Sequence, residues 1–372
     1  MAKTCLFIIN GLGLGNSTRC YAVIEHLLEH GFEIHVLTSG NGLIFFGNKE
    51  GIASLTPMEA FFYTGIHGRI SGWRILASLG SLYARARRKR AQLENLLHEI
   101  QADVVVTDSE YALAPVRRRR IPIIALNNAD VVVGEYLGGQ DRPRSIRSHF
   151  WAVEFSDYLF HRRVADLVIS PAAAPLKPRH ARIRRVGLII RRALRDALRR
   201  TEADPFPPPR QIRSVVFMLS GSIFASEIPF GDGAIPFHID VVGRSGPSRA
   251  NVTYHGKLMN NVPLLMKADA LVINAGFSAV SEAIALNKPT FVIPVPGHAE
   301  QFINARVLRD LGYGYIVTQE TVMPMLLKLY ERNEWEGLKP RGAITGIDGA
   351  REAAAIIEDF VGPSSTPPQR RG

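Results

Sequence analysis

Cysteine is almost absent from this 372-residue chain, and no apolar run approaches the roughly 20 residues of a membrane-spanning helix. Cys5 and Cys20 provide neither a disulfide framework nor metal-ligand spacing, so we expect two buried thiols in a reducing compartment. No cleavage site follows the short apolar start MAKTCLFIIN, which therefore predicts a first strand rather than a signal peptide. These features favour a cytoplasmic protein without a bound metal ion.

Acidic residues are the minority of the charged residues: 45 Lys and Arg against 34 Asp and Glu give a net charge of +11. The arginines are concentrated between Arg69 and Arg200, for example in RARRKR at 85–90 and RRRR at 117–120. One interpretation is nucleic-acid binding, but no recognition motif accompanies these runs. A second is attraction to anionic lipid headgroups on the inner face of a membrane, and a third is a solvated surface rich in Arg. We expect no specific nucleic-acid partner.

Short apolar strands alternate with helices and with Gly or Pro turns, which is typical of parallel, doubly wound α/β sheets. We expect strands at 4–10, 33–39, 103–108, 122–128 and 165–171, and then at 214–221, 237–243, 251–256, 270–275, 289–295 and 313–318. Between the two series, GLIIRRALRDALRRTEADPFPPPR is rich in Arg and then in Pro. The sequence thus predicts Rossmann-like domains at 1–186 and 211–361, an inter-domain linker at 187–210 and a disordered tail at 362–372.

The second domain is organised around the stretch from Asn274 to Asn304. The buried strand that ends near Asn274 leads into a turn at Gly276 and Phe277, and Ser278 is a good N-cap for the helix that follows. The first N–H groups of a helix lack intrahelical partners, and the helix dipole favours negative charge beside them. The turn and the helix start therefore predict an anion site.

Acidic and amide side chains lie beside this anion site. Glu282, one helical turn further on, suits the two hydroxyl groups of a ribose, because an ionised carboxylate accepts two hydrogen bonds. Glu300 and Gln301 begin the next helix, which also carries Asn304, and they could reach a second polyol. The stretch as a whole predicts a nucleotide-sugar site.

The same residues carry a family resemblance. Gly276-x5-Glu282, then the strand end Pro294-Val295-Pro296, then Glu300-Gln301-x-x-Asn304, resembles the donor-binding signature of GT-B glycosyltransferases. The likeness is greatest to the lipid-linked peptidoglycan N-acetylglucosaminyltransferase (MurG-like) group and related UDP-glycosyltransferases. The resemblance implies two domains that face a cleft, with the nucleotide ribose on Glu282 and the donor sugar on Glu300 and Gln301.

A glycine-rich loop, GLGLGNSTR, follows the first strand. It lacks the third small residue and the later acidic residue of a dinucleotide site, and it lacks the Gly-Lys-Ser/Thr of a P-loop. It resembles the GxGxGHxxR loop of the same sugar transferases, which implies that the backbone at Gly13 and Gly15 passes close to ligand and that Arg19 is an anchor. Asn16 stands where that pattern has a His, the proposed general base. Asn cannot hold a proton at neutral pH, and we expect it to cap the first helix.

A catalytic base must therefore come from another residue. Asp108, at the end of the strand 103–108, is the favoured candidate, with Glu110 two residues further on. Asp108 could equally well be the N-cap of a helix, which would be a structural role. His67 and His98 are the alternatives.

Small and polar residues also follow other strands, where parallel sheets bind ligands at the carboxyl ends. Asn127 and Asn128 end one strand of the first domain. In the second domain we expect the loop of Ser220, Gly221 and Ser222 to hold the diphosphate, and the loop that begins at His255 and Gly256 to hold the nucleotide base.

These observations predict an inverting glycosyltransferase that uses neither a metal nor a cofactor, because a helix dipole replaces the cation. The expected donor is a UDP-sugar, and the acceptor is a hydroxyl group. A lipid-linked acceptor is one option, since the aromatic and basic segment 61–90 could lie on a membrane or simply pack on the sheet. The alternatives are a UDP-sugar hydrolase or epimerase, and a non-catalytic subunit that binds donor, which Asn16 fits.

Overall fold

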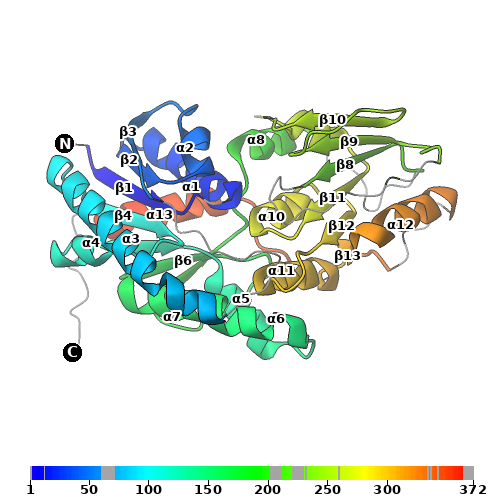
Figure 1. The fold of residues 1–372 in the computed structure, drawn as a ribbon. Coiled ribbons are helices and arrows are strands. Elements are labelled where there is room, and N and C mark those ends of the chain that lie inside the picture. Colours follow the sequence, from blue (N-terminus) through cyan, green and yellow to red (C-terminus); the bar gives the residue numbers. More distant parts are fainter. Residues whose placement is uncertain are drawn as a thin grey trace.

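The computed structural model consists of two α/β domains lying side by side (Figure 1). It describes residues 2–11, 13–59, 72–201, 206, 211–219, 230, 233–258, 260–332, 335, 337–341 and 343–362, with backbone only at 72–85. Within this part of the chain, no helix combines the length and apolar composition needed to cross a bilayer.

The first domain has one sheet of seven parallel strands, counted over the residues described, in the order β3-β2-β1-β4-β5-β6-β7. The strands are β1 (Thr4–Ile9), β2 (Glu33–Thr38), β3 (Ile52–Pro57), β4 (Val104–Asp108), β5 (Ile123–Leu126), β6 (Leu167–Pro171) and β7 (Ile183–Val186). The strand order reverses between β1 and β4, which pair so that Ile9 lies beside Asp108. Ligands of such sheets bind at the carboxyl ends of the strands that flank this reversal.

Helices cover both faces of the first sheet. They are α1 (Leu14–Glu29), α2 (Asn41–Phe46), α3 (Gly72–Glu99), α4 (Ala114–Arg118), α5 (Ala129–Gly138), α6 (Arg144–His149), the π-helical turn η1 (Phe150–Glu154) and α7 (Phe155–Val164). Gly31 follows α1 with φ +77°, a conformation that ends a helix and favours glycine, as the sequence predicts.

The second domain repeats the pattern, with six parallel strands among its described residues in the order β10-β9-β8-β11-β12-β13. The strands are β8 (Ser214–Met218), β9 (His238–Val242), β10 (Val252–Gly256), β11 (Ala270–Asn274), β12 (Thr290–Ile293) and β13 (Gly314–Ile316). Its helices are α8 (Arg192–Arg200), α9 (Val262–Lys267), α10 (Phe277–Ala285), α11 (Ala299–Asp310) and α12 (Gln319–Arg332). The predicted doubly wound fold of two parallel sheets is confirmed.

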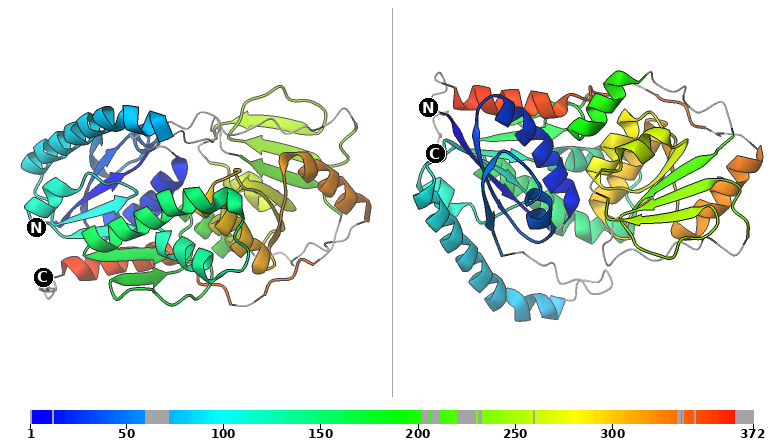
Figure 2. Two further views of the ribbon diagram at one scale, coloured as in Figure 1. Left: turned by 60° about the horizontal axis from the view of Figure 1, so that its bottom comes forward. Right: turned by 90° about the horizontal axis from the view of Figure 1, so that it is seen from above.

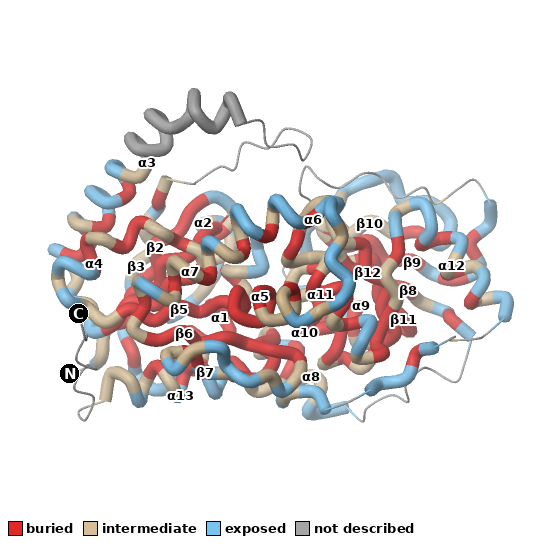
Figure 3. Tube along the Cα trace, turned by 90° about the horizontal axis from the view of Figure 1, so that it is seen from below, coloured by how far each residue is buried: buried red, intermediate tan, exposed pale blue. Residues whose placement is uncertain are grey.

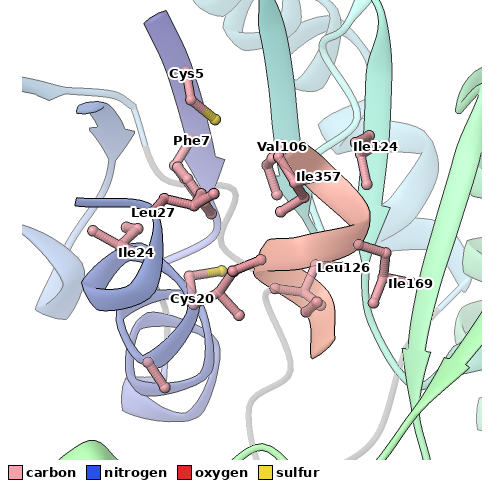
Figure 4. Close-up of a cluster of buried hydrophobic side chains, with 14 of the residues drawn as sticks. Cys5, Phe7, Cys20, Ile24, Leu27, Val106, Ile124, Leu126, Ile169 and Ile357 are labelled. Carbon is pink, nitrogen blue, oxygen red and sulfur yellow. The ribbon is translucent and has the colours of Figure 1, made fainter. Parts of the chain in front are cut away.

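The last helix, α13 (Gly349–Val361), leaves the second domain and packs on the first. Ala353 and Ile357 are buried in the same apolar cluster as Phe7 and Val106, and Figure 4 shows Ile357 beside the first sheet. The sequence predicts this helix as part of the second domain, 211–361, which is wrong. Its small apolar residues indicate a buried helix but do not say which of two similar sheets it covers.

Two strands of the first sheet, and a helix within the predicted linker, were not expected. The edge strand β3 is half-exposed, and β7 carries Arg184 and Arg185 at its centre, so neither forms an apolar run. The predicted linker at 187–210 contains α8, and Leu188 and Leu194 lie in the core of the second domain.

The two domains meet along a seam of helices. α1 of the first domain faces α10, and α5 and α6 face α11 (Figure 2). Figure 3 shows that the chain is buried along the strands of both sheets and where α5 lies against α11. The carboxyl end of the first sheet and the N-termini of α10 and α11 are thus brought together.

Candidate active site

The glycine loop after β1 lies directly on the backbone of its neighbours. The Asn10 N–H donates to the Asp108 carbonyl oxygen at 3.0 Å, which holds the start of the loop at the end of β4. A Cβ on Gly11 would lie only 1.7 Å from the backbone oxygen of Ser39. Gly11 therefore allows a close approach of two backbones, whereas a Cβ on Gly13 would meet no described atom within 4 Å.

Two helix N-termini meet at the seam. α1 begins after Gly13 and α10 begins after Gly276, and among the described residues neither N-cap position has a side-chain cap. The Ser278 hydroxyl donates to the Gly15 carbonyl oxygen at 3.1 Å and joins the two helix starts. Ser278 is therefore not the N-cap that the sequence predicted, because the N-cap position is Gly276, two residues earlier, and the Ser278 hydroxyl bonds across the seam. The partial positive charge of both ends favours an anion here.

Asn16 lies in the first turn of α1 and is likewise not the N-cap. Its amide donates to the Asn10 carbonyl oxygen at 3.4 Å, and its oxygen accepts from Arg19 at 3.2 Å. These two bonds tie the loop to the helix. Asn16 acts as a support of the glycine loop.

Asp108, the expected base, is fully buried and ion-paired. Arg19 donates to both of its oxygens, from Nε at 3.0 Å and from Nη2 at 2.8 Å. Burial raises the pKa of the Asp108 carboxyl, and Arg19 partly offsets the rise. In this conformation the carboxylate cannot contact an acceptor hydroxyl, so the expectation of a general base at Asp108 is not supported by its surroundings.

Glu110 is equally inaccessible. Its carboxylate accepts from Lys89 Nζ at 2.8 Å, and both side chains are at most 2% exposed. Glu110 also accepts from the Tyr111 N–H at 3.1 Å. The pair attaches α3 to the end of β4, which is a structural role.

Glu282, the expected ribose ligand, lies in α10 with both oxygens engaged. Arg191 donates to Oε1 from Nε at 2.6 Å and to Oε2 from Nη2 at 2.8 Å. This two-point contact with the guanidinium fixes the orientation of the buried carboxylate. Sequence reasoning missed Arg191, because one Arg in an Arg-rich linker carries no distinguishing signal.

The expected donor-sugar residues come together at the start of α11. Glu300 Oε1 accepts from Asn128 of the first domain at 3.2 Å and from Asn304 at 3.5 Å. Asn304 also donates to the Ala275 carbonyl oxygen at 3.0 Å, and Gln301 accepts from the Val295 N–H at 3.0 Å. The start of α11 thus contacts both strand ends of the second domain, and its Glu300 contacts Asn128, which precedes α5 of the first.

A cluster that the sequence did not indicate lies next to Glu300. His149 and Glu154 bracket η1 in the first domain, and the His149 ring lies 4.6 Å from the ring of His298 in the second. Burial lowers the pKa of His149 to about 4, with His298 adding to the effect. Burial, and then the neighbouring Glu300, raises the pKa of Glu154 well above its ordinary value. His298 and Glu300 are about 150 residues from His149 and Glu154 in sequence, so only the fold brings the two pairs together.

The remaining expected residues are dispersed. Asn274 donates to the Ile293 carbonyl oxygen and joins β11 to β12. His255 contacts Asp240 at 2.6 Å, and Gly256 follows with φ +62°. His98 is exposed in the last turn of α3. Ser220, Gly221, Ser222 and His67 lie outside the described residues.

The fold and the seam define a two-domain glycosyltransferase of the GT-B type, and comparison with known proteins agrees. The model of the family described as Glycosyl transferase family 1 matches residues 3–138 and 237–330. Since these regions make up more than half of the chain, the protein belongs to glycosyl transferase family 1 and is a glycosyltransferase.

Individual relatives span most of the chain. One from Methanosarcina acetivorans, described as an uncharacterized glycosyltransferase, is 23% identical over 98% of this chain and 97% of its own length. A UDP-N-acetylglucosamine–N-acetylmuramyl-(pentapeptide) pyrophosphoryl-undecaprenol N-acetylglucosamine transferase from Rhodospirillum rubrum is 26% identical over 82% of this chain and 77% of its own.

Solved structures share the fold. MurG from Acinetobacter baumannii superposes with a TM-score of 0.58 at 14% identity and covers 96% of this chain and 99% of its own. CalG4, the calicheamicin glycosyltransferase, gives a TM-score of 0.60 at 16% identity, with 98% and 99% covered. The resemblance stated from the sequence, to GT-B glycosyltransferases and the MurG-like group, is confirmed.

Proposed function

We propose that this glycosyltransferase inverts configuration while it transfers a hexose or N-acetylhexosamine from a nucleoside diphosphate sugar to a hydroxyl acceptor. The observation that carries the proposal is the contact between the starts of α1 and α10, made by Ser278 and Gly15. The two helix ends favour the negative charge that develops on a departing nucleoside diphosphate. In this proposal they replace a metal cation at the diphosphate.

The donor would lie along the second domain, with its ribose at Glu282. Arg191 occupies one lone pair on each carboxylate oxygen, and the other lone pairs can accept from the ribose hydroxyls. The transferred sugar would lie at Glu300, Gln301 and Asn304, next to Asn128. This arrangement places the anomeric carbon at the seam, where an acceptor bound on the first-domain side can approach it.

We infer that the nucleotide is UDP and that the acceptor is lipid-linked. One structural neighbour, LpCGTa, is a complex with UDP, and another, VinC, is a complex with dTDP. The relative from Rhodospirillum rubrum is named for transfer to a pyrophosphoryl-undecaprenol acceptor. The net charge of +11 supports a peripheral contact with anionic lipid on the cytoplasmic face.

In the transfer step the acceptor hydroxyl attacks the anomeric carbon opposite the diphosphate, which inverts its configuration. Asp108 and Glu110 are buried in ion pairs, and Asn16 does not titrate, so in this proposal the acceptor's proton passes to solvent water. The bond between the anomeric carbon and the diphosphate oxygen breaks, and the diphosphate leaves with the electron pair. We propose that Asp108 positions Arg19, which in turn holds Asn16 and the glycine loop.

A thermal-shift panel of UDP-, dTDP- and GDP-sugars tests the donor site. Wild type should be stabilised by one nucleotide class, and Glu282→Gln should lose most of that stabilisation. Glu331→Gln, on the outer helix α12, is the matched control and should behave as wild type. If none of the three nucleotides raises the unfolding temperature of wild type, the donor proposal is wrong.

Product analysis then separates transfer from hydrolysis. Incubation with the preferred donor and a polyprenyl-linked acceptor should give a glycosylated lipid. Release of free sugar at the same rate with and without acceptor would identify a hydrolase instead.

A further inference from the structure

His149, Glu154 and His298 form a compact group across the domain seam. One possible ligand atom from each lies within 4.8 Å of the other two. His149 Nδ1 and Glu154 Oε1 are 3.4 Å apart, and Glu154 is largely buried. Two of the residues come from the first domain and the third from the loop before α11.

We propose that these three residues bind one divalent transition-metal cation of the zinc type and thereby join the two domains. Two imidazoles and a carboxylate are a ligand set that zinc accepts, with a fourth position open to water. Ligand atoms around a tetrahedral zinc are about 3.3 Å apart, given bonds of about 2.0–2.1 Å. The His149–Glu154 pair already has this spacing, so His298 is the ligand that must move inward.

Local charge also favours a cation. The carboxylate of Glu154 accepts from the Glu300 N–H, which brings a second carboxylate, that of Glu300, into the same partly buried space. Two carboxyl groups this close disfavour each other's negative charge, and a divalent cation removes that penalty. The partial positive charge at the start of α11 disfavours a cation. The attraction of the cation to the two carboxyl groups acts against this repulsion.

The existing hydrogen bonds are weak competitors. The Ala299 N–H donates to His149 Nδ1 at 3.4 Å, and the Gln301 N–H donates to His298 Nδ1 at 3.5 Å. Both are at the long limit for a hydrogen bond, so exchanging them for metal bonds loses little. Binding through either ring nitrogen of His298 ends its bond to Gln301, because Nδ1 is then metallated or protonated.

A cation at this place acts as a clasp between the domains and does not take part in the transfer. The three proposed ligands, His149, Glu154 and His298, are not among the residues assigned to the donor, so zinc binding can be tested without any nucleotide sugar. It would be tested on metal-stripped, tag-free protein by titration with ZnCl2, and by the visible spectrum after addition of CoCl2.

Wild type should bind about one zinc per chain, and the cobalt form should show the intense absorption of a four-coordinate site. Glu154→Gln and His298→Asn should each weaken zinc binding at least about tenfold, by analogy with the loss that even indirect partners cause. Both variants keep an oxygen acceptor for the helix N–H groups, so folding should be preserved. Thermal unfolding of both variants without metal, compared with that of metal-free wild type, checks that folding is preserved.

His238→Asn is the matched control, because His238 also lies near a carboxylate, Asp240 at 3.3 Å, but outside the cluster. It should bind zinc as wild type does. If wild type takes up no zinc, or if Glu154→Gln and His298→Asn retain the affinity of wild type, the clasp does not exist.

Discussion

Arg191 donates to both carboxylate oxygens of Glu282, at 2.6 and 2.8 Å, and so links the chain that joins the domains to helix α10. The Glu282 side chain is 5% exposed and that of Arg191 24%. A buried carboxylate without its partner is strongly disfavoured. The pair therefore constrains both the linker and the carboxylate that we propose to bind ribose.

Replacing Arg191 by Ala should lower the free energy of unfolding of the second domain by about 1–3 kcal/mol, because Glu282 is left buried without a counter-charge. Urea unfolding measures the change. Arg199→Ala removes an exposed ion pair with Asp348 and should change stability by less than about 0.5 kcal/mol. Equal effects of the two variants would show that the Arg191 pair is no more important than a surface pair.

Neighbouring residues of α3 offer a second comparison. Lys89→Met breaks the buried pair with Glu110 and should destabilise the first domain by about 3–5 kcal/mol. Arg88→Met breaks an exposed pair with Glu59 and should have no measurable effect in the same urea titration. The double variant Lys89→Met, Glu110→Leu should recover most of the loss, since no unpaired charge then remains.

The buried pair of Asp157 and His161 should make stability depend on pH. Burial opposes both charges, but the partners prevail, so that the pKa of Asp157 is lowered and the pKa of His161 is raised. The Asp157 contribution is lost as pH falls through its lowered pKa, and the His161 contribution is lost as pH rises through its raised pKa. The Asp157–His161 ion pair therefore makes its full contribution to the free energy of unfolding from about pH 4 to about pH 6.5.

Asp157→Asn should accordingly destabilise the protein by about 1–3 kcal/mol at pH 6 and by clearly less at pH 9. Urea unfolding at the two pH values measures this difference. Glu358→Gln, which removes the exposed partner of His30, is the control and should have a small effect at both. A loss that is the same at pH 6 and pH 9 would contradict the assignment of charges.

Replacing two glycines of the same loop by alanine should change the free energy of unfolding by different amounts. Gly11→Ala places a Cβ against the Ser39 carbonyl oxygen and should reduce the free energy of unfolding by at least about 2–3 kcal/mol. Gly13→Ala meets no described atom and should reduce it by about 1 kcal/mol or less, the value of a poorer N-cap. If the donor proposal is right, Gly13→Ala still weakens nucleotide binding, and comparing stability with affinity separates the two roles.

Glu300→Gln tests the sugar position. The neutral amide keeps an oxygen for Asn128 but accepts hydrogen bonds less strongly than a carboxylate, so affinity for the nucleotide sugar should fall about five- to tenfold. Affinity for the free nucleoside diphosphate should not change, because it lacks the sugar. Isothermal titration of both ligands measures the difference. A parallel loss of both affinities would place Glu300 outside the sugar site.

The strands and the donor-side helices were predictable because each carries a local signal. The strand Ala270–Asn274 is apolar up to its last residue and ends near glycine. Glu282, Glu300 and Asn304 stand at spacings that resemble a known signature. The strand β7 and the helix α8 were missed because their arginines conceal the apolar residues that pack inward. Ser278 and Asn16 were misplaced as caps because a hydroxyl or amide near a helix start has several possible partners.

The sequence by itself determined two parallel α/β domains, the glycine loop, and the polar residues that end the strands. Only the tertiary structure decided which charges are paired: it buries Asp108 against Arg19 and attaches Arg191 to Glu282. It also decided that α13 packs on the first domain and that His149 lies beside His298. The physical reason is that strands and helices follow from periodicity over a few residues. Ion pairs and domain contacts depend on distances between residues up to hundreds of positions apart, which no local pattern encodes.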